Sequence, residues 1–306
     1  MSLHIVVGSG PVGSATSRLL LDRGHHVRVI TRSGTGVDGT EKVAADAADT
    51  SRIAELTEGA AAIYNCVNPP YDQWTTAWPP IAASLLAAAE SAGAVLATTS
   101  NLYVYGEVDA PMTESHPLAA TGTKGRVRIQ MWRDALAAHQ AGRVRVFEVR
   151  GSDYIGAKAS SLLSLVVLPA WAKGRTAWIP GALDAAHSWT DVEDVARLLV
   201  TGAQDPRAWG RAWHVPTAEP RTMRELTTMA AEVMHVEPKV RPLPYAAVWA
   251  AGLFNRSVRE LRETQHQFRR PFILDSSAAQ ETFGIEPIPT REAITREVAA
   301  TAAPAG

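Results

Sequence analysis

Three glycines near the start of the chain have the spacing of a phosphate-binding loop. They stand in GSGPVG, between the apolar run LHIVV and a helical pattern. The first glycine permits a tight turn, the second lets a phosphate approach the backbone, and the third lets helix and strand pack closely. The N-terminus of a helix also attracts anions. We therefore expect a dinucleotide pyrophosphate at Gly8, Gly10, Pro11, Val12 and Gly13, with a glycine turn that binds nothing as the alternative.

The residues after the second predicted strand indicate which dinucleotide binds. An NAD site has an acidic residue about 20 positions beyond the glycine loop, where it holds the ribose 2′-hydroxyl. This chain has Thr31, Arg32 and Ser33 there instead. A guanidinium beside hydroxyl groups suits a 2′-phosphate, so we expect NADP in preference to NAD, a solvated loop charge being the alternative for Arg32. Asp46, at the end of the third strand, is expected near the adenine or, alternatively, at a helix N-cap.

The elements that must position these residues alternate between strand and helix as far as about residue 150. Short apolar runs are separated by Ala/Leu-rich helical segments that close on glycine, which is typical of a parallel sheet covered on both faces. The expected strands are LHIVV, HVRVIT, KVAAD, AAIYNCV, AVLATTS and VRVFEV. The pattern predicts an α/β fold with a doubly wound parallel sheet, the Rossmann fold, of about seven strands.

The chain beyond residue 150 loses this regularity and becomes richer in proline and tryptophan. We expect residues 1–150 to form the dinucleotide-binding domain, completed by about 187–216, where the helix DVEDVARLLVTGA precedes a further strand, RAWHVP. Residues 151–186 and 217–300 would form a smaller, mainly helical substrate-binding lobe over the carboxyl edge of the sheet, and 301–306 a frayed tail.

Composition limits the class of partner. The chain has 306 residues, of which 46% are hydrophobic, and its 30 basic and 31 acidic side chains give a net charge of −1. That balance argues against nucleic acid and an anionic membrane, so we expect a small-molecule substrate, with a homodimer as the candidate assembly. The apolar runs are shorter than the roughly 20 residues of a membrane span. With Cys66 as its single cysteine and no metal-ligand spacing, the chain is expected to be cytoplasmic and to bind no metal.

Together these features resemble the short-chain dehydrogenase/reductase superfamily, specifically the extended and atypical members of its NAD-dependent epimerase/dehydratase group. The resemblance runs almost end to end and includes the glycine loop, AADAAD, NCVNPP, TTSNLYVYG, RGSDYIG, WTDVEDVARLLV and FILDSSAAQETFGIEP. It implies that Val67, Asn68 and Pro69 line the central part of the cofactor and that the lobe after residue 150 covers the substrate.

The catalytic residues of that family are the main departure. Its members carry a Ser or Thr after the fifth strand and the motif YxxxK on the next helix. Alignment on the end of SNLYVYG places Asn101 at the hydroxyl position. Alignment on Lys124 places Ala120 at the tyrosine, and a shift by one residue gives Thr121 and Gly125. In neither register does a tyrosine stand at the family's position.

A displaced tyrosine would supply the missing proton donor, because a phenol near an ammonium group can pass a proton to a carbinol oxygen. Tyr103 is the first candidate, since its loop borders the nicotinamide in the family that the chain resembles, and Tyr154 and Tyr71 follow. Lys124 would hold the nicotinamide ribose. Core packing of Tyr103 and a surface position for Lys124 are the alternatives. The expected catalytic set is Tyr103, Lys124, Asn101 and Ser100.

The substrate is expected to be small and fairly apolar. Family members that act on sugar nucleotides often carry an arginine in the segment that here reads AAHSWTDVEDV, and this segment has none. The expected substrate contacts are Tyr71, Trp74, Tyr154 and Trp189, with ordinary packing as the alternative for the tryptophans. The sequence thus predicts an atypical NADP-dependent oxidoreductase or epimerase-like enzyme for a carbonyl or alcohol. The alternatives are a redox-independent cyclase or isomerase, and an NADP-binding sensor or scaffold without catalysis.

Overall fold

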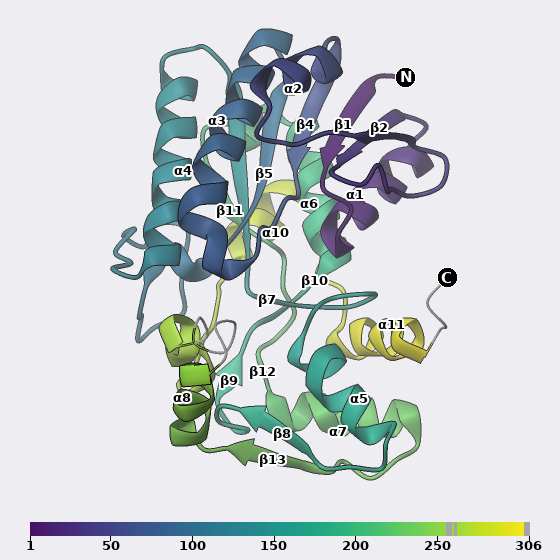
Figure 1. The fold of residues 1–306 in the computed structure, drawn as a ribbon, viewed down its shortest axis with the longest axis vertical. Helices are drawn as coiled ribbons and strands as arrows, with labels where there is room; N and C mark the ends of the chain where they lie inside the picture. The colour runs from purple at the N-terminus through teal and green to yellow at the C-terminus, as the bar shows by residue number, and fades with distance from the viewer. Residues whose placement is uncertain (255–258, 260–261, 303–306) are drawn as a thin grey trace.

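A seven-stranded parallel sheet forms the centre of the N-terminal part of the molecule (Figure 1). The computed structural model describes residues 1–254, 259 and 262–302. The strand order is β11-β6-β5-β4-β1-β2-β3, and every neighbouring pair runs parallel. The strands are β1 (Leu3–Val7), β2 (His26–Thr31), β3 (Glu41–Ala44), β4 (Ala60–Asn65), β5 (Val95–Asn101), β6 (Arg145–Gly151) and β11 (Ala212–His214). The expected Rossmann fold is confirmed.

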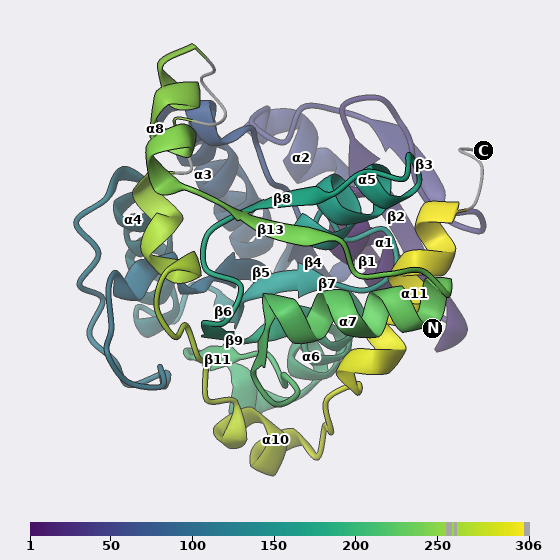
Figure 2. The same cartoon turned by 90° about the horizontal axis from the view of Figure 1, so that it is seen from below.

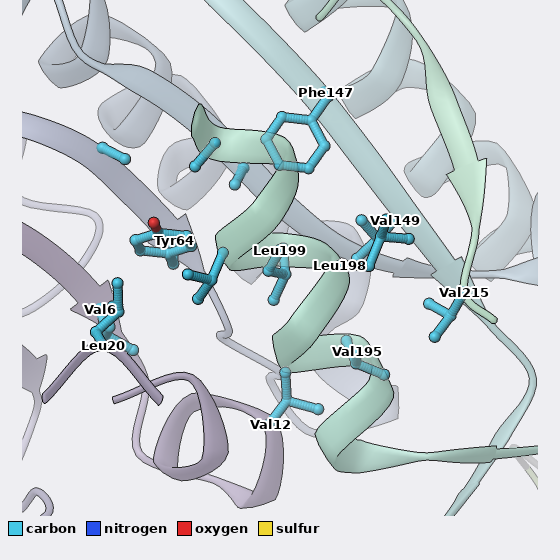
Figure 3. Packing of buried hydrophobic residues seen from close by; sticks show 14 of the residues in the cluster. Val6, Val12, Leu20, Tyr64, Phe147, Val149, Val195, Leu198, Leu199 and Val215 are labelled. Atoms are coloured by element: carbon cyan, nitrogen blue, oxygen red, sulfur yellow. The ribbon is translucent and has the colours of Figure 1, made fainter. Parts of the chain in front are cut away.

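Helices cover both faces of this sheet because successive strand side chains point to opposite sides. One face carries α1 (Pro11–Asp22) and α6 (Val192–Gln204), and the other carries α2 (Thr50–Thr57), α3 (Trp74–Ala92) and α4 (Thr123–Gln140). In β1, Val6 packs in the cluster with α1 and α6, which Figure 3 shows from close by. Ile5 and Val7 pack in the cluster with the other three helices. The strands are therefore buried on both faces.

Apart from α6 and β11, which belong to the main sheet and its cover, most of the chain after β6 builds a smaller lobe below the carboxyl edge of the sheet (Figures 1 and 2). Its short strands pair two by two: β7 (Asp153–Ile155) with β10 (Trp189–Asp191), β8 (Ala177–Pro180) with β13 (Val240–Leu243), and β9 (Ala186–His187) with β12 (Arg221–Thr222). Its helices are α5 (Leu168–Trp171), α7 (Met223–Met234), α8 (Tyr245–Phe254) and α11 (Thr290–Ala302). A separate apolar core holds the lobe together, and α10 (Ser277–Phe283) returns to β11.

Short helical turns lie in several of the connecting loops. They are η1 (Tyr71–Gln73), η2 (Leu102–Tyr105), η3 (Leu163–Val167), η4 (Pro206–Ala208) and η5 (Gln265–Phe268). The seven predicted strands of the sheet agree with the structure to within two residues at each end. The three small sheets of the lobe were not foreseen, because strands of two to four residues are too short to show an alternating pattern.

Candidate active site

The glycine loop joins β1 to α1 and leaves no space for a side chain at two of its glycines. Gly8 has a φ of +100°, and a Cβ there would lie 2.6 Å from the carbonyl oxygen of Cys66. A Cβ on Gly13 would overlap the carbonyl oxygen of Gly8. Gly10, the N-cap of α1, differs because a Cβ there would meet no atom within 4 Å.

The start of α1 also fits a phosphate. No side chain caps this helix end, whose first residues are Pro11 and Val12. The first N–H groups of a helix have no partner inside the helix and attract an anion. Open space at Gly10 beside these groups is the geometry that a pyrophosphate requires, so the loop fits the dinucleotide expected from the sequence.

Hydroxyl groups connect the loop after β1 to the loop after β2. The Oγ1 atom of Thr35 lies 3.3 Å from Ser9 Oγ and 3.0 Å from Ser33 Oγ. The hydroxyl of Thr31 donates to the backbone oxygen of Thr35 at 3.0 Å. Arg32 is exposed in the same loop. The loop that carries Arg32 therefore contacts the glycine loop through Thr35 and Ser9, two residues that sequence reasoning did not select.

The loop after β3 separates the two alternatives for Asp46. Its Oδ1 accepts a hydrogen bond from the backbone N–H of Ala48 at 3.0 Å. The N-cap of α2 is Asp49, whose side chain accepts from the N–H of Arg52. The alternative for Asp46, a helix N-cap, is therefore wrong, and its place near the adenine stays a prediction.

The loop after β4 is fixed by two hydrogen bonds. The N–H of Val67 donates to Asn65 Oδ1 at 3.2 Å, and Trp74 Nε1 donates to the carbonyl oxygen of Pro69 at 2.9 Å. Pro69 is buried, whereas Asn68 is exposed. This loop borders the glycine loop, because Cys66 is the residue that a side chain on Gly8 would strike.

Two phenol groups meet beyond the carboxyl ends of β4 and β5. Tyr71 begins η1, Tyr103 lies in η2, and their hydroxyl oxygens are 2.9 Å apart. The N–H of Tyr103 donates to Asn101 Oδ1 at 3.1 Å, which holds the turn after β5. The Trp74 ring lies against both phenols, with centroid distances of 5.2 Å to Tyr71 and 6.1 Å to Tyr103. The structure thus brings together Tyr71, Tyr103 and Trp74, three aromatic residues that the sequence analysis proposed for the site.

Lys124 is buried beside this pair. Its Nζ lies 5.4 Å from the centre of the Tyr71 ring and 3.3 Å from Glu263 Oε2, and its backbone N–H donates to Glu263 Oε1 at 2.7 Å. The side chain is only 1% exposed, so the alternative of a surface position for Lys124 is wrong.

Arg128 is a second buried cation, one helical turn after Lys124 on α4. Its guanidinium lies over the rings of Trp74 and Trp78, with its central carbon 4.8 and 4.3 Å from their centres. Its Nη1 donates to the carbonyl oxygen of Thr99 at 3.2 Å. Sequence reasoning missed Arg128, because KGRVR does not tell which of its cations is buried.

Burial and neighbouring charges control the protonation of the phenols. Burial raises the pKa of Tyr103 well above its usual value, and Tyr71 and Asp153 raise that pKa further. Burial also raises the pKa of Tyr71. The positive charge of Arg128 opposes both increases in pKa. Tyr103 is therefore protonated at neutral pH, and Arg128 offsets part of the loss of acidity that burial causes.

The other two tyrosines near this edge are engaged in hydrogen bonds. The Oη of Tyr105 lies 2.7 Å from His214 Nε2 and accepts from Arg150 Nη1 at 2.8 Å, so Tyr105 is part of a buried network. Tyr154 Oη donates to the carbonyl oxygen of Ser100 at 3.2 Å, and burial raises the pKa of Tyr154. The Ser100 hydroxyl is buried and has no hydrogen-bond partner among the described residues.

These elements match a known family. The family model for the NAD dependent epimerase/dehydratase family matches residues 5–215. The chain belongs to this family. The match includes the glycine loop, both phenols and α4, so the resemblance found in the sequence is confirmed. The expectation of an enzyme is confirmed with it, since the family is one of epimerases and dehydratases.

Solved structures share the fold of this family member over nearly its whole length. The enzyme WbmH of Bordetella bronchiseptica, in complex with NAD+, is 20% identical, with 98% of both chains covered and a TM-score of 0.76. The dTDP-glucose 4,6-dehydratase of Bacillus anthracis, in complex with NAD, is 15% identical, with 98% of this chain and 96% of that chain covered and a TM-score of 0.80. The UDP-glucose 4-epimerase of Thermus thermophilus, in complex with NAD, is 18% identical, with 99% and 100% covered and a TM-score of 0.78. Among curated proteins, none matches the sequence significantly.

Gly125 stands at the lysine of YxxxK if the motif is aligned with Thr121 at its tyrosine. In this epimerase/dehydratase family member, helix α4 leaves no space for a lysine side chain at that position. A Cβ on Gly125 would lie 2.7 Å from the carbonyl oxygen of Tyr103 and would overlap the Cβ of Ala120. The helix therefore packs directly against the loop that carries Tyr103. The cations near the phenols come from Lys124 and Arg128 instead.

Two further polar residues near the site contact each other: Asp153 on β7 and His187 on β9. Asp153 Oδ2 lies 2.8 Å from His187 Nε2, and His187 Nδ1 lies 3.1 Å from the carbonyl oxygen of Gln267. Sequence reasoning did not select Asp153, although it stands in the segment RGSDYIG and begins β7. Trp189 packs in the core of the lobe and donates to the carbonyl oxygen of Arg221 at 2.8 Å. Its contact with a substrate stays a prediction.

Two features are absent from the described residues. No group of three or more His, Cys, Asp and Glu side chains there could hold a metal ion. No helix in the same part of the chain is long and apolar enough to cross a membrane.

Proposed function

We propose that the protein is an NADP-dependent oxidoreductase or epimerase-like enzyme that acts on a small, fairly apolar carbonyl or alcohol. The observation that carries this proposal is the Tyr71–Tyr103 pair, with 2.9 Å between its hydroxyl oxygens, at the carboxyl edge of the sheet. In open α/β sheets, ligands bind at this edge. A cytoplasmic location remains part of the proposal.

The cofactor proposal rests on the loops after β1, β2 and β4. Gly10 and the uncapped start of α1 would hold the pyrophosphate, and Arg32 and Ser33 would hold a 2′-phosphate. Lys124 would hold the nicotinamide ribose, in exchange for part of its contact with Glu263. Bound NADP(H) would supply or accept the hydride.

Tyr103 would be the proton donor to the substrate oxygen. The phenol is protonated at neutral pH, as the reduction of a carbonyl requires, and the charge of Arg128 offsets part of the acidity that burial takes away. The hydroxyl of Tyr71 would then donate to the Tyr103 phenolate across their 2.9 Å contact. The charge of Arg128 lowers the pKa of both phenols and so stabilises the negative charge left on the pair.

The proposed substrate is less polar than the sugar nucleotides in the names of the similar structures. The ring of the buried Trp74 lies against the two phenols. The segment from Ala185 to Val192 carries His187 and Trp189 but no arginine. Such surroundings favour an aromatic or aliphatic carbonyl compound over a diphosphate.

The test is the change in NADPH absorbance with a panel of aliphatic, alicyclic and aromatic carbonyl compounds, compared with UDP-glucose and dTDP-glucose. Oxidation of NADPH with an apolar carbonyl supports the proposal. If product forms without net oxidation of NADPH, the reaction should be repeated with deuterated cofactor, since an epimerase returns the hydride to its substrate and leaves the cofactor unchanged. If cofactor binds but neither NADPH oxidation nor product formation occurs with any compound, the redox proposal is contradicted in favour of a scaffold.

A further inference from the structure

Helix α8 is strongly apolar and yet mostly exposed. Its sequence, YAAVWAAGLF, contains no charged residue. The exposed fractions are 41% for Tyr245, 46% for Trp249, 58% for Leu253 and 92% for Phe254, whereas Val248 is buried. Figures 1 and 2 show the helix at the margin of the lobe, on the side of α3 and α4. A helix that is apolar all round normally lies in a core or against lipid, so this surface calls for a partner.

Arginines surround the exposed aromatic residues of α8. The guanidinium carbon of Arg262 lies 4.6 Å from the centre of the Trp249 ring, and that of Arg269 lies 5.2 Å from the centre of the Tyr245 ring. Arg259 and Arg269 are exposed. Residues 237–270 contain seven basic and three acidic side chains, a local charge of +4 in a chain with a net charge of −1. This stretch of the sequence is therefore more basic than the chain as a whole, although Arg270 also lies 3.7 Å from the carboxylates of Glu107 and Asp109.

We propose that α8 and its arginines dock on the surface of a membrane that contains anionic lipids. Leucine, phenylalanine and tryptophan side chains enter the boundary between headgroups and acyl chains, while arginines bind lipid phosphates. The helix would lie in the plane of the membrane, since ten residues are too few to span it. This inference does not depend on the proposed reaction.

A second copy of the chain is a poorer partner for this surface. A symmetric contact would bring two copies of the same basic surface together, and like charges across an interface repel. A ten-residue helix also presents less surface than the roughly 800 Å² per partner of a stable interface. A membrane with anionic lipids offers acyl chains to the apolar side chains and phosphates to the guanidinium groups.

Docking through α8 would bring the candidate active site close to the membrane. Arg262, whose guanidinium lies on Trp249, directly precedes Glu263, which bonds Lys124. The η5 turn follows, and its Phe268 ring stacks on His187 with a centroid distance of 5.4 Å. The segment that carries the surface therefore also contacts residues of the site, through Glu263 and Phe268.

The test is co-sedimentation of the full chain with vesicles of phosphatidylcholine alone and of phosphatidylcholine mixed equally with phosphatidylglycerol. We expect binding to the mixed vesicles that weakens at high salt, because the charge contribution is screened. Leu253→Ser should weaken binding at least about tenfold, since burial of one leucine is worth that much in affinity. Leu165→Ser is the matched control: the residue is 63% exposed but lies in η3, before α5, and its variant should bind like the wild type. Arg269→Glu should weaken binding to the mixed vesicles only.

Several outcomes would overturn the proposal. One is a wild-type chain that does not sediment with mixed vesicles at low salt. Another is an equal loss of vesicle binding for Leu253→Ser and Leu165→Ser, which would mean that α8 is not the membrane-binding surface. A third is a dimer that Leu253→Ser dissociates, without vesicle binding, which would assign the surface to a second copy. Circular dichroism and thermal unfolding of each variant separate these results from misfolding.

Discussion

The hydroxyl oxygens of Tyr71 and Tyr103 lie 2.9 Å apart, although 32 positions separate the two residues. They meet because β4 and β5 are adjacent and parallel, so the loops that follow these strands leave the sheet at one edge. Gly125 lets α4 approach the Tyr103 loop, and Arg128 places its charge near both phenols. In the proposed function this pair takes the place of the tyrosine that the family carries on α4.

Removal of the Tyr71 hydroxyl tests the second member of the pair. Tyr71→Phe deprives Tyr103 of a hydrogen bond that would strengthen when the phenolate forms, and such a bond is worth about 1.5–3 kcal/mol. We expect kcat with NADPH to fall on the order of tenfold or somewhat more, with cofactor affinity unchanged. A larger fall than for Tyr103→Phe would instead make Tyr71 the direct donor.

The glycine loop allows stability and cofactor binding to be separated. Gly10→Ala adds a methyl group where no protein atom lies within 4 Å, so the free energy of unfolding without cofactor should change by less than about 1 kcal/mol. NADPH affinity, measured by fluorescence titration, should fall at least about tenfold because the methyl group occupies the path of the pyrophosphate. Gly13→Ala should instead lower stability, since its Cβ overlaps the Gly8 carbonyl oxygen. Unchanged NADPH affinity in Gly10→Ala would argue against this phosphate site.

Arg32 should decide the preference between the two dinucleotides. Arg32→Ala removes a charge-assisted contact with a 2′-phosphate, worth about 1.5–3 kcal/mol, so the ratio of NADP(H) to NAD(H) affinity should fall at least about tenfold. The affinity for NAD(H), which lacks the phosphate, should hardly change. Equal affinities for the two cofactors in the unmutated protein would refute the NADP preference.

Glu297 on α11 should make stability depend on pH. The carboxylate accepts from the backbone N–H of Gly156 at 3.0 Å and from the hydroxyl of Ser161, and burial raises its pKa to about 7. Since the unfolded-state pKa is about 4.3, the stability contribution is fully present below that pH and is lost as pH rises toward 7. Burial of the charged form then costs on the order of 3 kcal/mol.

Glu297→Gln removes this titration while it retains an amide at the same site. Chemical unfolding at several pH values from 4.5 to 8 should therefore show the variant gaining stability relative to the wild type as pH rises. A stability difference that stays constant over this range would show that Glu297 does not titrate as described.

The sequence was sufficient for the sheet and the glycine loop but not for the details of the site. Apolar runs such as LHIVV and the spacing of Gly8, Gly10 and Gly13 are local features, so β1 and the loop were predictable. The contact between Tyr71 and Tyr103 depends on strand order, and the burial of Arg128 depends on which face of α4 meets Trp74. Neither leaves a local pattern in the sequence.

Single-turnover oxidation of NADPH by Tyr103→Phe, with a carbonyl substrate that the wild type reduces, tests the central claim most directly. Tyr105→Phe is the matched control, because Tyr105 bonds His214 and Arg150 in the buried network and should affect stability more than the chemical step. We predict that Tyr103→Phe folds, binds NADPH as tightly as the wild type and loses roughly 10²- to 10⁴-fold in rate, the usual scale of general acid catalysis. A wild-type rate in Tyr103→Phe would contradict the account.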